Sequence, residues 1–265
     1  MNIKNKEKKK ITIISVCYNS EKTIRSTLES VKNQKYENIE HLIIDGSSTD
    51  KTMSIIKDYP HIKKVISEPD KGIYDAMNKG IEIATGDIIG FLNSDDFYFN
   101  NEVLSSVAST FDFNSSIDAC YADLIYTDQV DISKVVRYWK SNKFTLGSFS
   151  KGWCPPHTTF FVHKSIYQRF GVFNLNYSIA SDVELMMRLL EVNKINTIYV
   201  PEVWIKMRAG GTTNKSLKNI VTQNKEVLHA LKSHNLSVNW IIFLIYKIFS
   251  RSSQFLKSNN IWKKS

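Results

Sequence analysis

Two adjacent carboxylates, Asp95 and Asp96, stand where an apolar run ends, and together they could hold a divalent cation. The run DIIGFL at residues 87–92 is typical of a buried strand, so both acids follow the end of that strand. A polar turn that caps the next helix explains one acid, but it explains poorly two adjacent acids that repel each other. Mn²⁺ and Mg²⁺ prefer oxygen ligands and can bridge carboxylates to phosphate oxygens.

Other polar side chains also follow directly on apolar runs. They are Asn19, Asp45, Glu68 and Asp70. If the runs are parallel strands, these side chains lie along one rim of a sheet, where loops and helix N-termini converge and ligands bind. The turn CYNSEKT at residues 17–23 contains neither a Gly-x-Gly-x-x-Gly pattern nor a Walker lysine. The acidic rim therefore indicates that a phosphorylated ligand is held through a cation.

The first half of the chain alternates apolar segments of strand length with amphipathic segments of helix length. We expect strands at residues 11–17, 39–45, 63–68 and 86–93, and helices at residues 20–34, 48–59 and 72–84. This alternation is typical of repeated βαβ units around a mostly parallel sheet. The predicted fold class is therefore α/β.

Composition excludes several other classes of protein. The chain has 265 residues, of which 42% are hydrophobic, and can bury a substantial core in one large domain. Cys17, Cys120 and Cys154 are far apart and form no Cys-x-x-Cys pair, so neither a disulfide framework nor a zinc cluster is indicated and a reducing cytosol fits best. We interpret residues 1–10 as a basic disordered tail, because the apolar run after it is short and lacks the cleavage site of a signal peptide.

The positive charge of the chain is concentrated near its C-terminus. Residues 206–265 contain eleven Lys and Arg and a single acid, Glu226, so this segment accounts for the whole formal net charge of +9. The rest of the chain is close to neutral, and nucleic acid is not an expected partner. We interpret residues 213–265 as a basic, amphipathic helical extension.

The apolar stretch of this extension, WIIFLIY at residues 240–246, is too short to span a bilayer. Basic and aromatic residues around it fit a helix that lies in the headgroup region of an anionic membrane: Trp240, Lys247, Arg251, Lys257, Trp262, Lys263 and Lys264. The alternative is a C-terminal helix that packs its apolar face on the body of the protein.

Two segments of the chain resemble a known family. They are ISVCYNSEKTIRSTLESVKNQKYENIEHLIIDGSSTDKT at residues 14–52 and SEPDKGIYDAMNKGIEIATGDIIGFLNSDD at residues 67–96. Both look like glycosyltransferase family 2, the inverting enzymes of GT-A fold that build bacterial surface polysaccharides. The resemblance is close as far as residue 96 and looser as far as GGTTN at residues 210–214. It implies a GT-A catalytic domain over residues 11–212 with a mostly parallel central sheet.

The resemblance gives the rim residues roles in binding a sugar nucleotide. It implies that Asp45, helped by Asn19, contacts the base or ribose, since a carboxylate can accept two hydrogen bonds. The alternative for Asp45 is an ordinary turn. Asp95 and Asp96 correspond to the family's Asp-x-Asp element, which ligates Mn²⁺ or Mg²⁺ and so holds the diphosphate of the donor. Asn93 stands at the first position of that element, where its carbonyl oxygen can accept but brings no charge.

The segment EPDKGIYDAMNKG, residues 68–80, resembles the region that closes over the diphosphate and the sugar. Lys71 is expected to add positive charge beside the phosphates, and Tyr74 to lie near the start of the following helix. Asp75 and Asn78 are expected to contact the sugar or the nucleotide. The alternative is a solvated helix face, with a first-turn acid favoured by the helix dipole.

An inverting transfer needs a base that removes the proton of the acceptor hydroxyl. The resemblance implies that the base is Asp182, in NYSIASDVELMMRLLE at residues 176–191, with Ser181 where the family has Glu. Ser181 and Glu184 also match a capping box, in which Asp182 is favourable without catalysis. The two interpretations are compatible, because a helix N-terminus fixes a carboxylate and keeps it ionised.

Between the donor half and the base lies FSKGWCPPHTTFFVH, residues 149–163. The resemblance places His157 near the active site, in contact with the donor phosphates or the acceptor; the alternative is a histidine packed at the start of a strand. Trp153 could stack on a sugar ring or belong to the core.

The hypothesis is an enzyme, a metal-dependent inverting hexosyl- or N-acetylhexosaminyltransferase. It would move a sugar from a nucleotide diphosphate to a saccharide or lipid-linked acceptor in cell-surface polysaccharide biosynthesis, as a cytoplasmic protein peripheral to the membrane. Asn93 and Ser181 keep open a catalytically silent membrane adaptor of the same fold. A sugar-1-phosphate nucleotidyltransferase fits less well, because its Gly-rich activating loop is missing.

Overall fold

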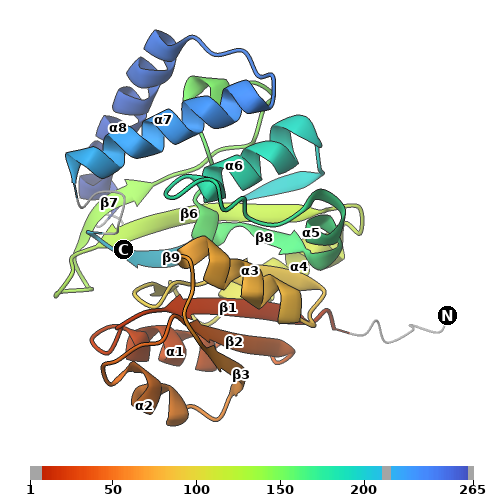
Figure 1. Cartoon of the computed structure of the whole chain (residues 1–265), viewed down its shortest axis with the longest axis vertical. Coiled ribbons are helices and arrows are strands. Elements are labelled where there is room, and N and C mark those ends of the chain that lie inside the picture. Colours follow the sequence, from red (N-terminus) through yellow and green to blue (C-terminus); the bar gives the residue numbers. More distant parts are fainter. Residues whose placement is uncertain (1–7, 211–215, 262–265) are drawn as a thin grey trace.

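The α/β fold predicted from the sequence is confirmed, with a sheet of nine strands. The computed structural model describes residues 8–210 and 216–261. The strands follow one another in the order β3-β2-β1-β4-β8-β6-β9-β5, and β7 pairs with β6. Helices lie on both faces of this sheet, and α7 and α8 lie at the opposite end of the molecule from β3 (Figure 1).

Four parallel strands form one side of the sheet: β1 (Ile11–Cys17), β2 (Ile39–Asp45), β3 (Ile62–Ser67) and β4 (Ile88–Phe91). Cys17 pairs with Asp45, which in turn pairs with Ser67. β1, β2 and β3 therefore end level with one another, whereas β4 ends at Phe91, which pairs with Ile14 of β1. The turn that follows β4 reaches the same rim, because Ser94 Oγ lies 2.8 Å from Ser20 Oγ. The parallel arrangement expected for this half of the chain is confirmed.

The other side of the sheet is mixed. Here β8 (Phe161–His163) is antiparallel to both of its neighbours, β4 and β6 (Ala119–Thr127). Next to β6 lies β9 (Thr197–Arg208), which is parallel to it. Two short strands, β5 (Phe97–Tyr98) and β7 (Val135–Trp139), pair antiparallel to β9 and β6.

One face of the sheet is covered by α1 (Ile24–Lys32), α2 (Thr52–Lys57) and α4 (Val103–Phe113). Ile24 and Leu28, at helical spacing on α1, pack against Ile43 of β2. The buried side chains of α4 pack against Ile11 and Ile13 of β1. Side chains alternate along a strand, so these positions define one face.

The other face is covered by α3 (Ile73–Ile83), α5 (Lys164–Phe170) and α6 (Ser181–Met187). A π-helical turn, Arg188–Val192, continues α6. A Cβ on Gly80 of α3 would overlap the Cγ2 atom of Ile14 in β1, so glycine lets this helix approach the sheet closely.

The helices α1 and α2 begin four residues later than their expected ranges, 20–34 and 48–59. The polar residues before them are bonded in loops instead: the N–H of Asn19 donates to Ser48 Oγ, and the N–H of Ser20 donates to Thr52 Oγ1. Ser, Thr and Asn side chains compete for backbone groups in this way and so favour turns over helix interiors.

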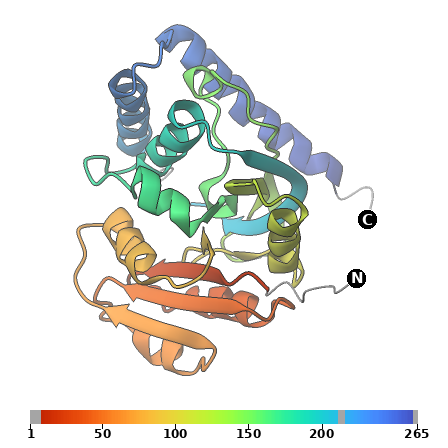
Figure 2. The same ribbon diagram turned by 90° about the vertical axis from the view of Figure 1, so that its right-hand side faces the viewer.

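The C-terminal segment forms α7 (Leu217–Ser233) and α8 (Trp240–Ile261), and Figure 2 shows α8 along the outside of the molecule. Val227, Ala230 and Leu231 of α7 are buried. On α8, Phe243 is buried and Gln254 accepts from Arg137 Nε at 2.6 Å. The expected boundary at residues 212 and 213 lies outside the described residues, as do Trp262, Lys263 and Lys264.

Part of the expected N-terminal tail lies against the body. Three ion pairs hold it: Lys8 with Glu37, Lys9 with Asp112, and Lys10 with Glu40. The remainder of that tail, residues 1–7, lies outside the described residues. Across the described part of the chain we find no helix of the length and apolarity that a membrane crossing requires.

Candidate active site

The loop after β1 is bonded to the loop after β2. Asn19 has a left-handed backbone, with φ of 48°, which Asn tolerates better than most residues. Its Oδ1 accepts from the N–H of Thr49 at 2.9 Å, and its own N–H donates to Ser48 Oγ at 2.8 Å. Asn19 is exposed at the rim, as predicted, and it also fixes the loop that carries Ser48.

Asp45 is fully buried at the end of β2, and its carboxylate is already saturated. Its Oδ2 accepts from the N–H of Ser48 at 2.9 Å and from Ser67 Oγ at 2.7 Å, while its Oδ1 accepts from Ser48 Oγ and faces Cys17 Sγ at 3.5 Å. These bonds hold the ends of β1, β2 and β3 together. Asp45 therefore has the structural role in a turn that was the alternative to nucleotide binding. A contact with a base or ribose stays a prediction.

The segment from Asn93 to Asp96 forms a tight turn after β4. The N–H of Asp96 donates to the Asn93 carbonyl oxygen at 3.0 Å, and Asn93 Nδ2 donates to Asp96 Oδ2 at 3.2 Å. Ser94 Oγ lies 2.8 Å from Ser20 Oγ, which joins this turn to the loop after β1. Asp95 is half-buried, whereas Asp96 is only 1% exposed. The two acids are therefore unequal, and Asp95 is the more accessible one.

Burial, and then the charge of Asp95, raises the pKa of Asp96 well above its ordinary value. Within the described residues, Asp96 Oδ1 and Asn93 Oδ1 are buried and have no hydrogen-bond partner. Buried oxygens without donors suit a cation, because it would satisfy them and neutralise the carboxylate. The oxygen-only set of Asn93, Asp95 and Asp96 thus fits Mn²⁺ or Mg²⁺.

The protein contributes a partial shell to such an ion. Over residues 8–210 and 216–261, no three His, Cys, Asp or Glu side chains converge to form a metal cluster. Mg²⁺ in particular usually takes one or two carboxylates and completes its shell with waters and substrate phosphates. The site therefore fits a cation that arrives with, or is completed by, a diphosphate.

Arg208, at the end of β9, lies next to the two acids. Its Nη1 is 3.4 Å from the carbonyl oxygen of Asp95, and its Nη2 donates to Ser26 Oγ at 3.0 Å. Its guanidinium also lies over the ring of Phe97, 5.1 Å from the centroid. The sequence interpretation did not single out Arg208; its position just before the GGTTN segment was the available signal.

The residues expected to close over the diphosphate and sugar occupy the start of α3. Lys71 is exposed, and its N–H donates to Asp75 Oδ2 at 3.0 Å. Asp75 is also 3.7 Å from Lys79 Nζ. Asp75 therefore stabilises the first turn of α3, as the structural alternative required, while Lys71 leaves its charge at the surface.

Asn78 is bonded to the loop between α5 and α6. Its Nδ2 donates to the carbonyl oxygen of Phe173 at 2.9 Å, and its Oδ1 accepts from the N–H of Phe173 at 2.9 Å. This reciprocal pair uses both ends of the amide and fastens α3 to the loop before α6. The side chain thus joins two parts of the protein, and a ligand contact stays a prediction.

Asp182 lies between two other predicted site residues, Tyr74 and His157. The Tyr74 hydroxyl is 3.0 Å from Asp182 Oδ1, and His157 Nδ1 is 3.2 Å from Asp182 Oδ2. The hydroxyl is also 2.7 Å from the carbonyl oxygen of Ile179. Burial, and then the charge of Asp182, raises the pKa of Tyr74 well above its ordinary value, so the phenol keeps its proton.

The capping box expected at the start of α6 is not formed. Ser181 is the first helical residue, not the N-cap, and its Oγ donates to the carbonyl oxygen of Asn174 at 2.8 Å. Glu184 instead pairs with Arg188 Nε at 2.9 Å and with His234 Nε2 at 2.8 Å. Asp182 lies in the first turn of α6, where the helix dipole favours an acid even without a capping box.

Trp153 belongs to an aromatic group rather than standing alone. Its ring lies near those of Tyr121, Phe144 and Phe149, with centroid distances of 6.1, 5.8 and 5.6 Å. Its Nε1 donates to Asn142 Oδ1 at 2.7 Å. The core alternative thus describes Trp153 better than a free sugar-stacking surface.

His157 and Asp182 lie close to the end of β4. Phe91, the last residue of β4, lines the same small void as His157 and Asp182, a space of about 10 Å³. The turn with Asp95 begins two residues after Phe91, at Asn93. The acids and the predicted base therefore lie around one end of the sheet, although they come from distant parts of the chain.

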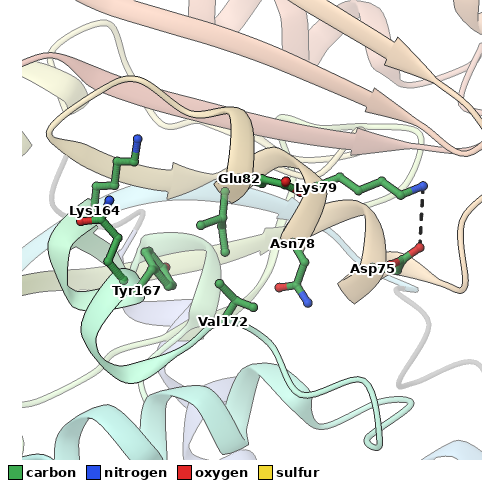
Figure 3. Close-up of a pocket in the computed structure, with 9 residues that line it drawn as sticks. Asp75, Asn78, Lys79, Glu82, Lys164, Tyr167 and Val172 are labelled. Carbon is green, nitrogen blue, oxygen red and sulfur yellow. Dashed lines mark ion pairs between the residues drawn. The ribbon is translucent and has the colours of Figure 1, made fainter.

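A larger cavity of about 480 Å³ lies between α3 and α5 (Figure 3). The figure shows the side chains of Asp75 and Lys79 pointing toward each other along α3, opposite Lys164 and Tyr167. Of the predicted site residues, only Asp75 and Asn78 line this cavity. The acids after β4 and Asp182 are not part of it, so it is distinct from the rim.

The fold and the residues gathered at its rim define the class of protein, a glycosyltransferase of GT-A fold. The family model described as Glycosyl transferase family 2 matches residues 12–176, and the chain belongs to this family. The match covers the turn with Asp95 and also His157, and it ends before Asp182.

Curated relatives extend the similarity over nearly the whole chain. The PGL/p-HBAD biosynthesis glycosyltransferase of Mycobacterium bovis (strain BCG / Pasteur 1173P2) is 25% identical over 248 residues, which are 91% of this chain and 93% of that protein. An uncharacterized glycosyltransferase of Mycobacterium tuberculosis (strain ATCC 25618 / H37Rv) is 29% identical over 185 residues, 67% of this chain and 68% of that protein. Both relatives are named as glycosyltransferases.

Solved structures share the fold. Residues 1–349 of S. aureus TarS in complex with UDP-GlcNAc align with a TM-score of 0.65 at 16% identity, covering 97% of this chain and 76% of that one. The mannosyltransferase PcManGT of Pyrobaculum calidifontis, in complex with GDP-Man and Mn²⁺, aligns with a TM-score of 0.58 at 16% identity, covering 98% and 89%. The GT-A fold expected from the sequence is thereby confirmed.

Proposed function

We propose that this glycosyltransferase moves a sugar, with inversion, from a nucleotide-diphosphate sugar to a saccharide or lipid-linked acceptor. The observation that carries the proposal is the arrangement of Asp182 between Tyr74 and His157, close to the end of β4 where Asp95 and Asp96 follow. Tyr74 and His157 each hold one oxygen of the Asp182 carboxylate, so the position of the proposed base is fixed.

In the proposed reaction Asp182 is the general base. The acceptor oxygen attacks the anomeric carbon of the sugar, and its proton passes to the Asp182 carboxylate. The bond between that carbon and the diphosphate oxygen breaks, and its electron pair leaves with the nucleoside diphosphate. Attack from the face opposite the leaving group inverts the configuration of the anomeric carbon.

Tyr74 can serve both protonation states of the base. Before transfer, its hydroxyl proton can point to Asp182 Oδ1, 3.0 Å away. After Asp182 has gained a proton, the hydroxyl can donate to the Ile179 carbonyl oxygen at 2.7 Å and accept from Asp182 instead. The phenol therefore stabilises the base before and after the proton moves.

His157 is proposed to orient the second oxygen of the base. A carboxylate beside Nδ1 favours the tautomer that carries its proton there, so Nδ1–H donates to Asp182 Oδ2 at 3.2 Å. The Nε2 atom is then available as an acceptor for a hydroxyl group of the acceptor or the donor. This arrangement keeps the contact with the acceptor that the sequence predicted.

Asn93, Asp95 and Asp96 are proposed to hold a divalent cation, with Asp95 as its most accessible ligand. When bound, Mn²⁺ or Mg²⁺ would stabilise the negative charge of the departing diphosphate. Lys71 and Asn19 are proposed to contact the donor at the same rim, where both are exposed. The complexes of TarS with UDP-GlcNAc and of PcManGT with GDP-Man and Mn²⁺ support this class of donor and cofactor.

The acceptor is proposed to reach the enzyme at an anionic membrane surface on its cytoplasmic side. Trp240 and Phe249 of α8 are 61% and 71% exposed, and Ile241, Ile245 and Tyr246 between them are also exposed. The inward side of α8 carries Phe243, which is 1% exposed. The helix therefore packs on the body with one side and presents an apolar side outward, which supports the proposed contact with a membrane.

Charge favours an anionic lipid as the occupant of this outer side. Residues 206–265 contain eleven basic residues and one acid. Juxtaposed basic residues and exposed aromatic and aliphatic side chains bind the headgroup region of anionic bilayers. A biosynthetic role on lipid-linked saccharides is consistent with the relative named for PGL/p-HBAD biosynthesis.

Donor turnover by the full chain tests the proposed function. UDP-GlcNAc, UDP-glucose and GDP-mannose are incubated with Mn²⁺, and the released nucleoside diphosphate is measured; the product anomer is then read by NMR. We expect turnover of at least one donor with inversion, and a loss of about 10²- to 10⁴-fold for Asp182→Asn. Retention of configuration, or full activity of Asp182→Asn, would contradict it. A folded protein that turns over none of them but binds vesicles would be the silent adaptor.

A further inference from the structure

The Glu226 carboxylate, on α7, accepts hydrogen bonds from the backbone of residues 178–180, which leads into α6. Its Oε1 accepts from the N–H and the Oγ of Ser178, at 2.9 and 2.6 Å. Its Oε2 accepts from the N–H of Ile179 at 2.9 Å and from the N–H of Ala180 at 2.8 Å. Three successive N–H groups and one hydroxyl thus converge on a single carboxylate.

Residues 178–180 are connected directly to the proposed base. Ile179, whose N–H is bound by Glu226, offers its carbonyl oxygen to the Tyr74 hydroxyl at 2.7 Å. That hydroxyl lies 3.0 Å from Asp182 Oδ1. Ala180 is the N-cap residue of α6, and Asp182 is the second residue of that helix. A shift of residues 178–180 would therefore displace the base and its phenol together.

We propose that Glu226 is a positioning residue, which sets the place and orientation of Asp182 from the C-terminal segment. The proposal rests on the proposed function, in which Asp182 is the base. Glu226 acts through the backbone of residues 178–180 and through Tyr74. It is the only acid of the strongly basic segment 206–265, yet its side chain is turned toward the active site rather than toward basic neighbours.

A carboxylate suits this position for two physical reasons. α6 has no side-chain cap of its own, so without Glu226 the N–H groups of Ile179 and Ala180 would lose their partners at a half-buried place. Four donors also need an acceptor-only group. Burial raises the pKa of Glu226, but the hydrogen bonds from Ser178, Ile179 and Ala180 outweigh it and leave the pKa below its ordinary value.

The rest of α7 holds Glu226 in place. Its buried residues Val227, Ala230 and Leu231 join the core on the α6 side of the sheet. The Tyr177 hydroxyl lies 3.1 Å from His229 Nδ1, one turn beyond Glu226. Just after α7, His234 Nε2 contacts Glu184 Oε1 at 2.8 Å. The segment regarded from the sequence as an extension is thus fastened to the helix that carries the base.

The isosteric variant Glu226→Gln tests the inference without removing volume. In this variant an NH2 group replaces one carboxylate oxygen, so two hydrogen-bond acceptor positions become donors. These donors face N–H or O–H groups of residues 178–180 and displace that segment. We expect kcat for the turnover of UDP-GlcNAc, or of the best donor of the panel, to fall about 10- to 100-fold, because small misplacements of a catalytic group cost that much. The KM for the donor should stay within about twofold. Lys225→Ala, an exposed neighbour on α7, is the matched control and should behave as wild type.

A double-mutant cycle with Asp182→Asn separates positioning from general loss of structure. If Glu226 acts through the base, Glu226→Ala should lower kcat in the wild type but hardly in the Asp182→Asn background. Equal effects of Glu226→Ala in both backgrounds, or a normal kcat for folded Glu226→Gln, would overturn this inference. Full activity of Asp182→Asn would instead overturn the proposed function, so the two failures are distinguishable. Thermal unfolding of each variant confirms that it is folded.

Discussion

The Tyr74 hydroxyl lies 3.0 Å from Oδ1 of Asp182, although the two residues are 108 positions apart in the chain. Tyr74 is the second residue of α3, in the half of the protein that resembles a donor-binding domain, and Asp182 is at the start of α6. One hydrogen bond therefore joins the proposed donor half to the proposed base. The same hydroxyl reaches the Ile179 carbonyl oxygen, whose residue is held by Glu226.

Tyr74→Phe should slow the reaction without weakening donor binding. The change removes one hydroxyl and leaves the ring, which stacks near Phe173 at 5.5 Å. Asp182 then loses the bond to Oδ1, and we expect kcat to fall by about tenfold. Steady-state kinetics with UDP-GlcNAc, or with the best donor of the panel, gives both kcat and KM.

The matched control for this change is Tyr246→Phe, on the exposed side of α8. It removes the same atom from an exposed side chain outside the proposed active site and should leave kcat unchanged. A Tyr74→Phe enzyme with wild-type kcat would show that the hydroxyl does not support the base. A rise in donor KM with constant kcat would point to a ground-state contact instead.

The pKa of Asp96 predicts how metal binding varies with pH. Burial and the charge of Asp95 raise this pKa, so the folded protein without a cation keeps a proton that the unfolded chain has lost, and its stability falls as pH rises above the ordinary Asp value. A cation displaces that proton, so its stabilising effect should grow with pH. We expect Mn²⁺ to raise the melting temperature more at about pH 8 than at about pH 5.5.

Variants of the two acids check this interpretation. Asp95→Ala should abolish the Mn²⁺ shift at both pH values, because it removes the accessible ligand. Asp96→Asn should remove the pH dependence of the shift, since no proton is then displaced. EDTA is the reference condition in each case. An Mn²⁺ shift that is equal at both pH values in the wild type would argue against Asp96 as a partner of the cation.

The exposed side of α8 predicts a membrane-binding variant. Phe249→Glu places a charge where an aromatic side chain is 71% exposed, and it should weaken binding to phosphatidylglycerol vesicles by about tenfold or more. Cosedimentation with vesicles measures the effect. Binding of the wild type should also fall with added salt, because basic residues contribute.

Phe113→Glu provides the control for this variant. Phe113 is the last residue of α4, and it is 90% exposed on a different helix. The same change of chemistry there should leave vesicle binding unaffected. If both variants bind as the wild type does, the apolar side of α8 is not a membrane surface.

The parallel half of the fold could be predicted because its apolar residues recur at the spacing of strands and helices. Strand β1 is mostly apolar and α1 repeats Ile24, Leu28 and Val31 on one side, so local spacing was sufficient. The strands β5 and β7 have two and five residues, and their pairing depends on distant partners, β9 and β6. No local pattern indicates such pairing.

The candidate site could be predicted only in part, for a related reason. The family resemblance indicated Tyr74, His157 and Asp182, and the structure places Tyr74 and His157 in contact with Asp182. The bonds of Asn78 go to the backbone of Phe173, and backbone atoms have no signature in the sequence. In the sequence, Glu226 was noted only as the single acid among eleven basic residues. Its contacts could not be predicted, because three of its four partners are backbone N–H groups.

Gly90→Ala should destabilise the fold that holds the rim. Gly90 lies on β4, and a Cβ there would overlap the ring of Phe161 on the adjacent strand β8. The backbone of a strand accepts alanine, so without this overlap the change would stabilise slightly. With it, we expect the free energy of unfolding in urea to fall by about 1–3 kcal/mol. Phe161→Leu should relieve the overlap, so the double variant should lose less than the sum of the two single changes. Additive losses would mean that a Cβ at position 90 does not press on the ring of Phe161. An unchanged stability of Gly90→Ala would mean that the two strands accommodate the added methyl group at no cost.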